Sequence, residues 1–258
     1  MSQAAIGADV RGEPISNDPV LGYFQRSELP LASLLFILPL MVLYELGTRF
    51  IVSQPNGGET RIIAFTLMRD FFSLFGATGR YLPCLAVIGI LLTWHIARRD
   101  GWKVQWGTLS GMVVESLVLA LPVLGLSYAV TRYVIPPLAG TVGVADPLSM
   151  LVLSIGAGIY EEAVFRLGAI TLLNLLLVDV VKIHRIVAIP AMVGLSALLF
   201  SGYHYLGNEP FQVQTFVFRT AAGLYFGGLF VLRGFGITAG CHAFYDVLVV
   251  LLPLLVRR

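Results

Sequence analysis

The chain has 258 residues, of which 57% are hydrophobic and only 12% are charged. An ordinary soluble domain carries about 25% charged residues, so this chain has too few polar side chains to cover a soluble fold. The composition excludes a soluble enzyme, a nucleic-acid-binding protein and a disordered protein. The formal net charge of +2 is also too small to indicate a polyanionic partner. Because the apolar residues occur in runs long enough to cross a membrane, the lipid bilayer is the first partner that the sequence predicts.

Residues 1–30 are expected to form a polar, mostly flexible tail. They mix charged residues with Gly and Pro, and they lack the apolar stretch of a secretory signal peptide. The chain carries no N-myristoylation pattern and no CaaX box. We therefore expect the protein to enter the membrane through its own helices.

Hydropathy over a window of about 19 residues predicts about seven membrane spans. Their approximate ranges are 31–51, 81–97, 107–130, 148–177, 186–206, 213–232 and 233–258. Residues 61–76 alternate apolar clusters with Arg61, Arg69 and Asp70, which favours an amphipathic helix at the interface over an eighth span. The predicted fold is an all-α polytopic membrane bundle of about seven to eight transmembrane helices.

Ionisable side chains within the spans are candidate functional residues, because inserting one at bilayer depth costs at least ~2.5–3.5 kcal/mol. Some have a structural explanation. Glu45 and Arg49 are spaced i,i+4 and can pair on one helix face. Glu115 can pair with an arginine elsewhere in the chain. Arg219 lies near the start of its span and can snorkel to the interface.

Three polar motifs on separate spans remain: YEEAVFR at 160–166, FSGYH at 200–204 and HAFYD at 242–246. Glu162 and Arg166 can form an i,i+4 ion pair. That pair leaves Glu161, about 100° away around the helix, free to face a cavity. His242 and Asp246 are also one turn apart on a single face.

Buried polar groups need partners, so we expect the three motifs to meet around one shared water-filled site inside the membrane. Unrelated polar pairs that hold helices together are the alternative. If every span crosses fully, His204 and His242 lie near opposite membrane faces. A shared site then requires the approach to the last helix, around Gly234 to Gly240, to enter the membrane as irregular backbone.

In their order along the chain, EExxxR, FxxxH and HxxxD resemble the motifs of the CPBP intramembrane proteases. That family includes the CAAX prenyl endopeptidases of the Rce type and the bacterial Abi proteins. The resemblance covers roughly residues 147–255 and implies a catalytic helical core there, preceded by N-terminal transmembrane helices over 31–146. It implies a glutamate-dependent endopeptidase that cleaves a peptide bond in or near the membrane. A membrane-associated peptide or protein, such as a CaaX tail, is the substrate class that it implies.

The resemblance also implies a role for each motif residue. Glu161 is expected to be the general base that activates a water together with His204. His242 and Asp246 are expected to face the scissile carbonyl and to stabilise the oxyanion. The residues expected to shape the site are Glu162, Arg166 and Phe200.

Asp246 stands where many family members have Asn. An ionised carboxylate would repel an oxyanion, so Asp246 is either protonated or orients and charges His242, which then donates alone. We favour the second arrangement, because it matches the Asp–His pairing of serine proteases.

No cofactor is expected, with zinc as the alternative. The motif carboxylates and histidines include plausible zinc ligands, and Cys241 could add a thiolate, but no HExxH spacing is present. Two other functions remain open: a catalytically inactive membrane scaffold or immunity factor, and a proton-coupled transporter. The chain has no eukaryotic targeting signal, so we expect an integral protein of a bacterial plasma membrane.

Overall fold

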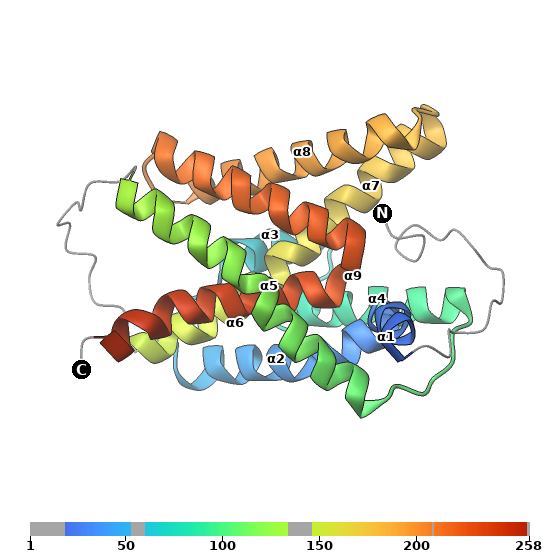
Figure 1. The fold of residues 1–258 in the computed structure, drawn as a ribbon, viewed down its shortest axis with the longest axis horizontal. Coiled ribbons are helices and arrows are strands. Elements are labelled where there is room, and N and C mark those ends of the chain that lie inside the picture. The colour runs from blue at the N-terminus through green and yellow to red at the C-terminus, as the bar shows by residue number, and fades with distance from the viewer. Residues whose placement is uncertain (1–18, 53–59, 134–145, 208, 257–258) are drawn as a thin grey trace.

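The protein is a bundle of helices in a computed structural model, which describes residues 19–52, 60–133, 146–207 and 209–256. No strand occurs within these ranges. The elements are α1 (Pro19–Ser27), α2 (Pro30–Phe50), α3 (Ile63–Ser73), α4 (Leu82–Arg98), α5 (Trp106–Tyr133), α6 (Pro147–Glu162), the π-helix η1 (Ala163–Ile170), α7 (Thr171–Asn174), the π-helix η2 (Leu175–Val180), α8 (Arg185–Tyr203), the 3-10 turn η3 (His204–Leu206) and α9 (Val213–Val256). Figure 1 shows the long helices packed side by side along one direction. The all-α prediction is confirmed.

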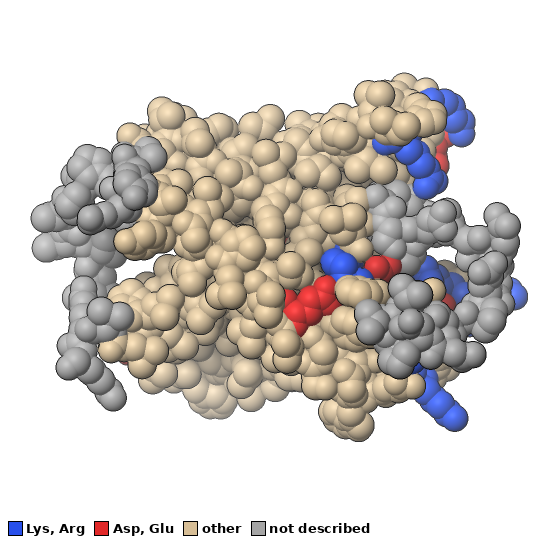
Figure 2. Space-filling model, viewed as in Figure 1, with Lys and Arg blue, Asp and Glu red and all other residues tan. Residues whose placement is uncertain are grey.

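Five helical segments in the described part of the chain are long and apolar enough to cross a membrane. They are Pro30–Phe50, Trp106–Val130, Pro147–Val180, Arg185–Leu206 and Val213–Leu255, and Leu82–Arg98 is a shorter apolar helix. The last of the five contains two of the expected spans. Figure 2 shows a broad surface without Lys, Arg, Asp or Glu side chains, with charged side chains gathered toward one end of the molecule and in one group on the face. The protein is therefore an integral membrane protein.

Two segments that precede the three polar motifs test the predictions for residues 61–76 and for the N-terminal tail. Residues 63–73 form a helix of 11 residues, too short to span a bilayer, as expected for 61–76. The flexible tail predicted for residues 1–30 is wrong in its second part, because Pro19–Ser27 is helical and Ser27 is fully buried. Residues 1–18 lie outside the described residues.

A sharp turn at Gly234 divides α9 into two halves. Its φ of 76° and ψ of −176° suit glycine, which has no Cβ to clash. The chain reverses there, and the second half runs back from the turn at an angle to the first (Figure 1). Phe226, eight residues before the turn, stacks on His242, eight residues after it, with ring centroids 4.5 Å apart. The irregular backbone expected around Gly234 to Gly240 is therefore confirmed at Gly234 alone, and the residues after it are helical.

The returning half of α9 packs closely on α6. A Cβ added at Gly158 would lie 2.4 Å from the backbone nitrogen of Ala243, the residue after His242. No side chain larger than hydrogen fits at this crossing, so the backbone of α6 touches the backbone that carries the third motif. The first motif follows directly, where α6 widens into η1 at Ala163. Such π-helical turns are rare and are frequently found at functional sites.

Two acidic side chains of the spans outside the three motifs form ion pairs with arginines from other segments. Glu115 receives two hydrogen bonds from Arg233, at 2.6 and 3.0 Å, as its lack of a local partner predicts. The expected Glu45–Arg49 pair is wrong, since Glu45 pairs at 2.9 Å with Arg61 from the α2–α3 connection. The reason is geometric: Arg61 is nearly buried beside Glu45, whereas Arg49 is exposed.

Candidate active site

Glu162 and Arg166 form the ion pair that their spacing predicts. Arg166 Nε lies 3.1 Å from Glu162 Oε2, and both side chains are fully buried. The N–H does not point along this line, so the contact is an ion pair without an aligned hydrogen bond. Arg166 Nη2 donates to the carbonyl of Gly223 at 3.1 Å, and the guanidinium lies 4.4 Å from the centre of the Phe200 ring. These contacts anchor the start of η1 against α8 and α9.

The other oxygen of Glu162 holds His242. Glu162 Oε1 lies 2.7 Å from His242 Nδ1, while Asp246 Oδ2 lies 3.6 Å from Nε2 of the same ring. Phe226 stacks on this ring with an interplanar angle of 17°. Asp246 thus lies beside His242 as its i,i+4 spacing predicts, and its role in orienting and charging the ring stays a prediction. Glu162 makes the short contact because the turn at Gly234 brings His242 onto the end of α6.

His204 follows the end of α8, on the other side of Glu161. Its Nδ1 lies 2.8 Å from the carbonyl oxygen of Phe200, which can only accept, so this nitrogen carries the proton. The Nε2 of a neutral His204 is then a bare acceptor, and it faces Glu161. Phe200 thus shapes the site twice, through its carbonyl and through its ring, which lies edge-on to both His204 and His242.

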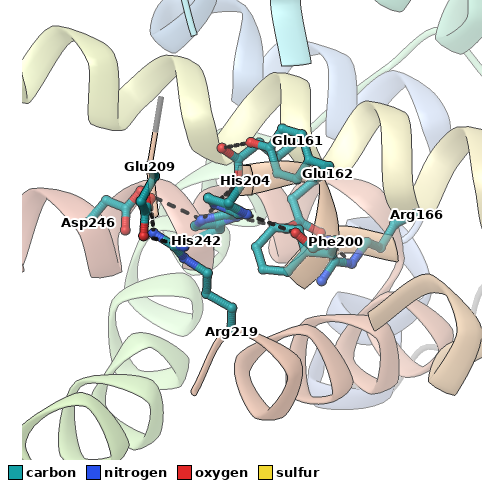
Figure 3. Close-up of polar contacts among 10 residues, drawn as sticks. Glu161, Glu162, Arg166, Phe200, His204, Glu209, Arg219, His242 and Asp246 are labelled. Carbon is teal, nitrogen blue, oxygen red and sulfur yellow. Dashed lines mark hydrogen bonds and ion pairs between the residues drawn. The ribbon is translucent and has the colours of Figure 1, made fainter. Parts of the chain in front are cut away.

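Glu161 is the point where the motifs meet. Tyr203 donates its hydroxyl hydrogen to Glu161 Oε1. Glu161 Oε2 lies 4.0 Å from His204 Nε2 and 3.8 Å from His242 Nε2. These distances are too long for direct hydrogen bonds and short enough for one water to bridge. Figure 3 shows the convergence, which confirms that the three motifs share one site.

The site is more open on one side than on the other. The side chains of Glu161 and His242 are 8% and 5% exposed, against 20% for His204 and 27% for Asp246. Access is therefore from the side where α8 ends and α9 begins. The water-filled cavity expected there stays a prediction.

Arg219 lies at this side of the site. It forms a two-pronged ion pair with Glu209 at 2.8 and 2.9 Å, and its snorkelling to the interface stays a prediction. The pair is drawn beside Asp246 and His242 in Figure 3.

Sequence reasoning missed Tyr203, Phe226 and the Glu209–Arg219 pair. Tyr203 lies inside the second motif, one residue before His204, and a buried tyrosine hydroxyl usually has a polar partner. This rule predicts a polar partner for Tyr203, and in the structure that partner is Glu161. Phe226 has no local signal, because its contact with His242 depends on the turn in α9.

Zinc ligation fits the site poorly. Within the described ranges, no three His, Cys, Asp or Glu side chains are grouped so that they could hold a metal ion. Both oxygens of Glu162 already contact Arg166 and His242. A reaction that needs no metal stays a prediction.

One Glu and two His side chains converge in this membrane bundle, between α6, the end of α8 and α9. The protein therefore belongs to the class of helical membrane proteins with a buried cluster of ionisable side chains. Residues 143–248 match a family model described as type II CAAX prenyl endopeptidase, Rce1-like. The matched range contains all three motifs, so the resemblance that these motifs carry is confirmed. No curated protein and no solved structure matches the chain.

Proposed function

We propose that the protein is an intramembrane endopeptidase that processes CAAX-type or related peptides at a bacterial plasma membrane. The observation that carries the proposal is the position of Glu161 Oε2, which both His204 Nε2 and His242 Nε2 face at 4.0 and 3.8 Å. The family match supports the same reaction class.

Water activation is assigned to Glu161 and His204. A water in the gap between Oε2 and Nε2 has two acceptors for its protons, and neither histidine directly occupies Oε2. Glu161 takes a proton as the water oxygen attacks the scissile carbonyl carbon. The proton then passes to the departing amine, so the products are a carboxylic acid and a free amine. Tyr203 holds the other carboxylate oxygen and thereby orients Oε2.

Oxyanion stabilisation is assigned to His242. When both ring nitrogens are protonated, Nδ1 donates to Glu162 at 2.7 Å and Nε2 is left to donate to the oxyanion. Asp246, at 3.6 Å from Nε2, favours this charged ring without itself donating. Glu162 is therefore a positioning residue, in the role that serine proteases give to aspartate.

The direct test uses purified protein in nanodiscs and internally quenched peptides ending in a CaaX sequence, with and without a prenyl group on the cysteine. We expect wild-type protein to cleave and Glu161→Ala or His204→Ala protein to lose cleavage. Absence of cleavage by wild-type protein would assign the chain to the inactive scaffolds instead, and equal cleavage by wild-type and variant protein would remove Glu161 and His204 from the chemistry. Comparison of membrane-protein termini between wild-type and Glu161→Ala cells extends the test to substrates outside the panel.

Metal dependence is tested in the same assay. We expect full activity after treatment with a chelator and gel filtration. Loss of activity that zinc restores would contradict the metal-independent part of the proposal.

A further inference from the structure

The connection between α2 and α3 lies outside the three motifs, yet it is bonded to the residue next to Glu161. Arg61 Nη1 donates to Glu45 Oε2 at 2.9 Å, and Tyr160 donates its hydroxyl hydrogen to Glu45 Oε1 at 3.1 Å. Tyr160 directly precedes Glu161 and is fully buried. Arg61, Glu45 and Tyr160 therefore form one chain of hydrogen bonds from the α2–α3 connection to the end of α6.

The ring of Tyr160 is also held by two other aromatic rings. Phe65, in the first turn of α3, meets it edge-on with the ring centroids 5.0 Å apart, and Tyr44 of α2 lies at 5.3 Å. The Arg61 guanidinium covers Phe65 at 4.5 Å from the ring centre. Successive residues of an α-helix are about 100° apart around its axis, so a fixed Tyr160 also fixes the direction in which Glu161 points.

The first residue of α3 reaches the end of the second motif. A Cβ added at Gly207 would lie 3.2 Å from Cδ1 of Ile63, so these two residues are in close contact. Gly207 follows His204 after the single 3-10 turn η3. Ile63 is only two residues from Arg61, and Phe65, two residues further on, is buried, which anchors this part of α3.

The two contacts lie on the two sides of the gap in which the attacking water is expected. This gap separates Glu161 Oε2 from His204 Nε2 by 4.0 Å. Arg61 holds the side of Glu161, and Ile63 holds the side of His204. Because so short a segment contacts both sides, it limits how far the gap can widen or close. A misplacement of about 1 Å in a reacting geometry can cost about 100-fold in rate.

We propose that Arg61 and Ile63 are positioning residues, which set the distance between Glu161 and His204 and hence the place of the attacking water. The inference rests on the proposed endopeptidase function and extends its machinery to the N-terminal part of the chain. Both residues precede the range that the family model matches, residues 143–248. The matched part alone then lacks residues that the reaction needs.

The contact at Gly207 allows a test by compensation in the nanodisc assay. Gly207→Ala adds a methyl group that forces its neighbour away by a few tenths of an ångström, and Ile63→Val removes the Cδ1 that this methyl group meets. We expect Gly207→Ala to lower kcat about 10-fold with little change in KM, and Gly207→Ala/Ile63→Val to return kcat to within about twofold of wild type. Gly194→Ala, on α8 where an added Cβ meets nothing within 4 Å, is the control. An unchanged kcat in Gly207→Ala, or losses that add up in the double variant, would overturn the inference and leave the endopeptidase function intact.

The contact through Tyr160 has its own matched pair of variants. Tyr160→Phe keeps the ring and removes the hydroxyl that donates to Glu45, and we expect kcat to fall about 3- to 10-fold at unchanged KM, as for the loss of one hydrogen bond. Tyr44→Phe is the control, because the hydroxyl of this equally buried ring has no hydrogen-bond partner among the described residues. Arg61→Lys, which keeps a cation beside Glu45, should retain more of kcat than Arg61→Met. Equal kcat for Tyr160→Phe and Tyr44→Phe would overturn the assignment of Arg61.

A spectroscopic measurement separates failure of the inference from failure of the proposed function. The chain has four histidines, so ¹⁵N-histidine labelling gives few resonances. Without substrate, we expect the Nε2 resonance of His204 to shift in Gly207→Ala, to return in Gly207→Ala/Ile63→Val and to stay in place in Gly194→Ala. This pattern in a protein that cleaves no peptide would contradict the proposed function and leave the positioning intact. An unshifted resonance in Gly207→Ala overturns the inference whether or not any peptide is cleaved.

Discussion

Two groups of buried charges on α9 differ in how closely their members are paired. In the Arg233 cluster (Tyr23, Ser27, Glu28, Glu115 and Arg233), the guanidinium donates to two carboxylates and a hydroxyl at 2.6–3.0 Å. In the active-site group, Glu162 contacts His242 directly at 2.7 Å and Tyr203 donates to Glu161 Oε1, but the other oxygen of Glu161 and Asp246 Oδ2 lie 3.6–4.0 Å from histidine nitrogens. Direct contacts saturate a charge and hold helices together. The distances from Glu161 Oε2 to the histidine nitrogens are too long for direct hydrogen bonds, so this oxygen can accept a hydrogen bond from a water molecule.

Removal of the base should have the largest effect on activity. Glu161→Gln keeps the shape and an acceptor for Tyr203 but cannot take a proton from water. We expect kcat to fall by about 10²–10⁴-fold, the usual contribution of a positioned base, with unfolding unchanged. The peptide-cleavage assay measures kcat, and unfolding by SDS titration in mixed micelles measures stability. Glu28→Gln, in the Arg233 cluster, is the control. Activity within threefold of wild type for Glu161→Gln would remove Glu161 from the chemistry.

The Arg233 cluster should show the reverse pattern. Arg233→Met leaves Glu115 and Glu28 without their shared cation, and we expect about 3 kcal/mol less stability, as for other broken buried pairs. Arg233→Met/Glu115→Leu should recover part of this loss, because an apolar pair needs no counter-charge. The folded fraction of both variants should still cleave peptide. If the single variant is as stable as wild type in SDS titration, the distinction between the two groups fails.

The contact of α6 with the returning half of α9 can be broken by one methyl group. Gly158→Ala places a Cβ 2.4 Å from the Ala243 nitrogen, and we expect about 1–3 kcal/mol of destabilisation together with reduced kcat. Gly228→Ala is the matched control, because a Cβ there meets nothing within 4 Å and alanine favours the helix. Equal stability of the two variants would show that α6 and α9 can separate without cost.

Loss of the stack on His242 should have the smallest effect. Phe226→Leu keeps an apolar side chain but removes the ring that covers the imidazole at 4.5 Å. We expect kcat to fall about 3- to 10-fold, in line with about 0.5–1.5 kcal/mol for an aromatic pair. Phe230→Leu, one turn along and equally buried at 1%, should cost stability without a matching change in kcat. A larger fall in kcat for Phe230→Leu than for Phe226→Leu would show that the ring of Phe230, and not the stack on His242, supports cleavage.

Local patterns were enough for part of this description. Long apolar runs located the helices, because every backbone polar group in a bilayer must be satisfied within a helix. The i,i+4 spacing located the Glu162–Arg166 pair, because both residues lie on one short stretch. The same rule failed for Glu45, where Arg61, sixteen residues away, competes successfully with Arg49.

Contacts between distant segments were outside the reach of such patterns. Glu162 and His242 are 80 residues apart and Glu115 and Arg233 are 118 apart, so no spacing rule joins them. Both contacts depend on how the other helices pack around α9, the first on its returning half and the second on the residue before the turn.

The amino-acid sequence specifies a helical membrane protein and the residue types of its polar motifs, since hydropathy and helical periodicity are properties of neighbouring residues. The folded chain determines the contacts: Glu162 makes the shortest polar contact to His242, and Tyr203 donates a hydrogen bond to Glu161. The physical reason is the reversal at Gly234, where one positive φ places His242 beside Phe226 and against the end of α6.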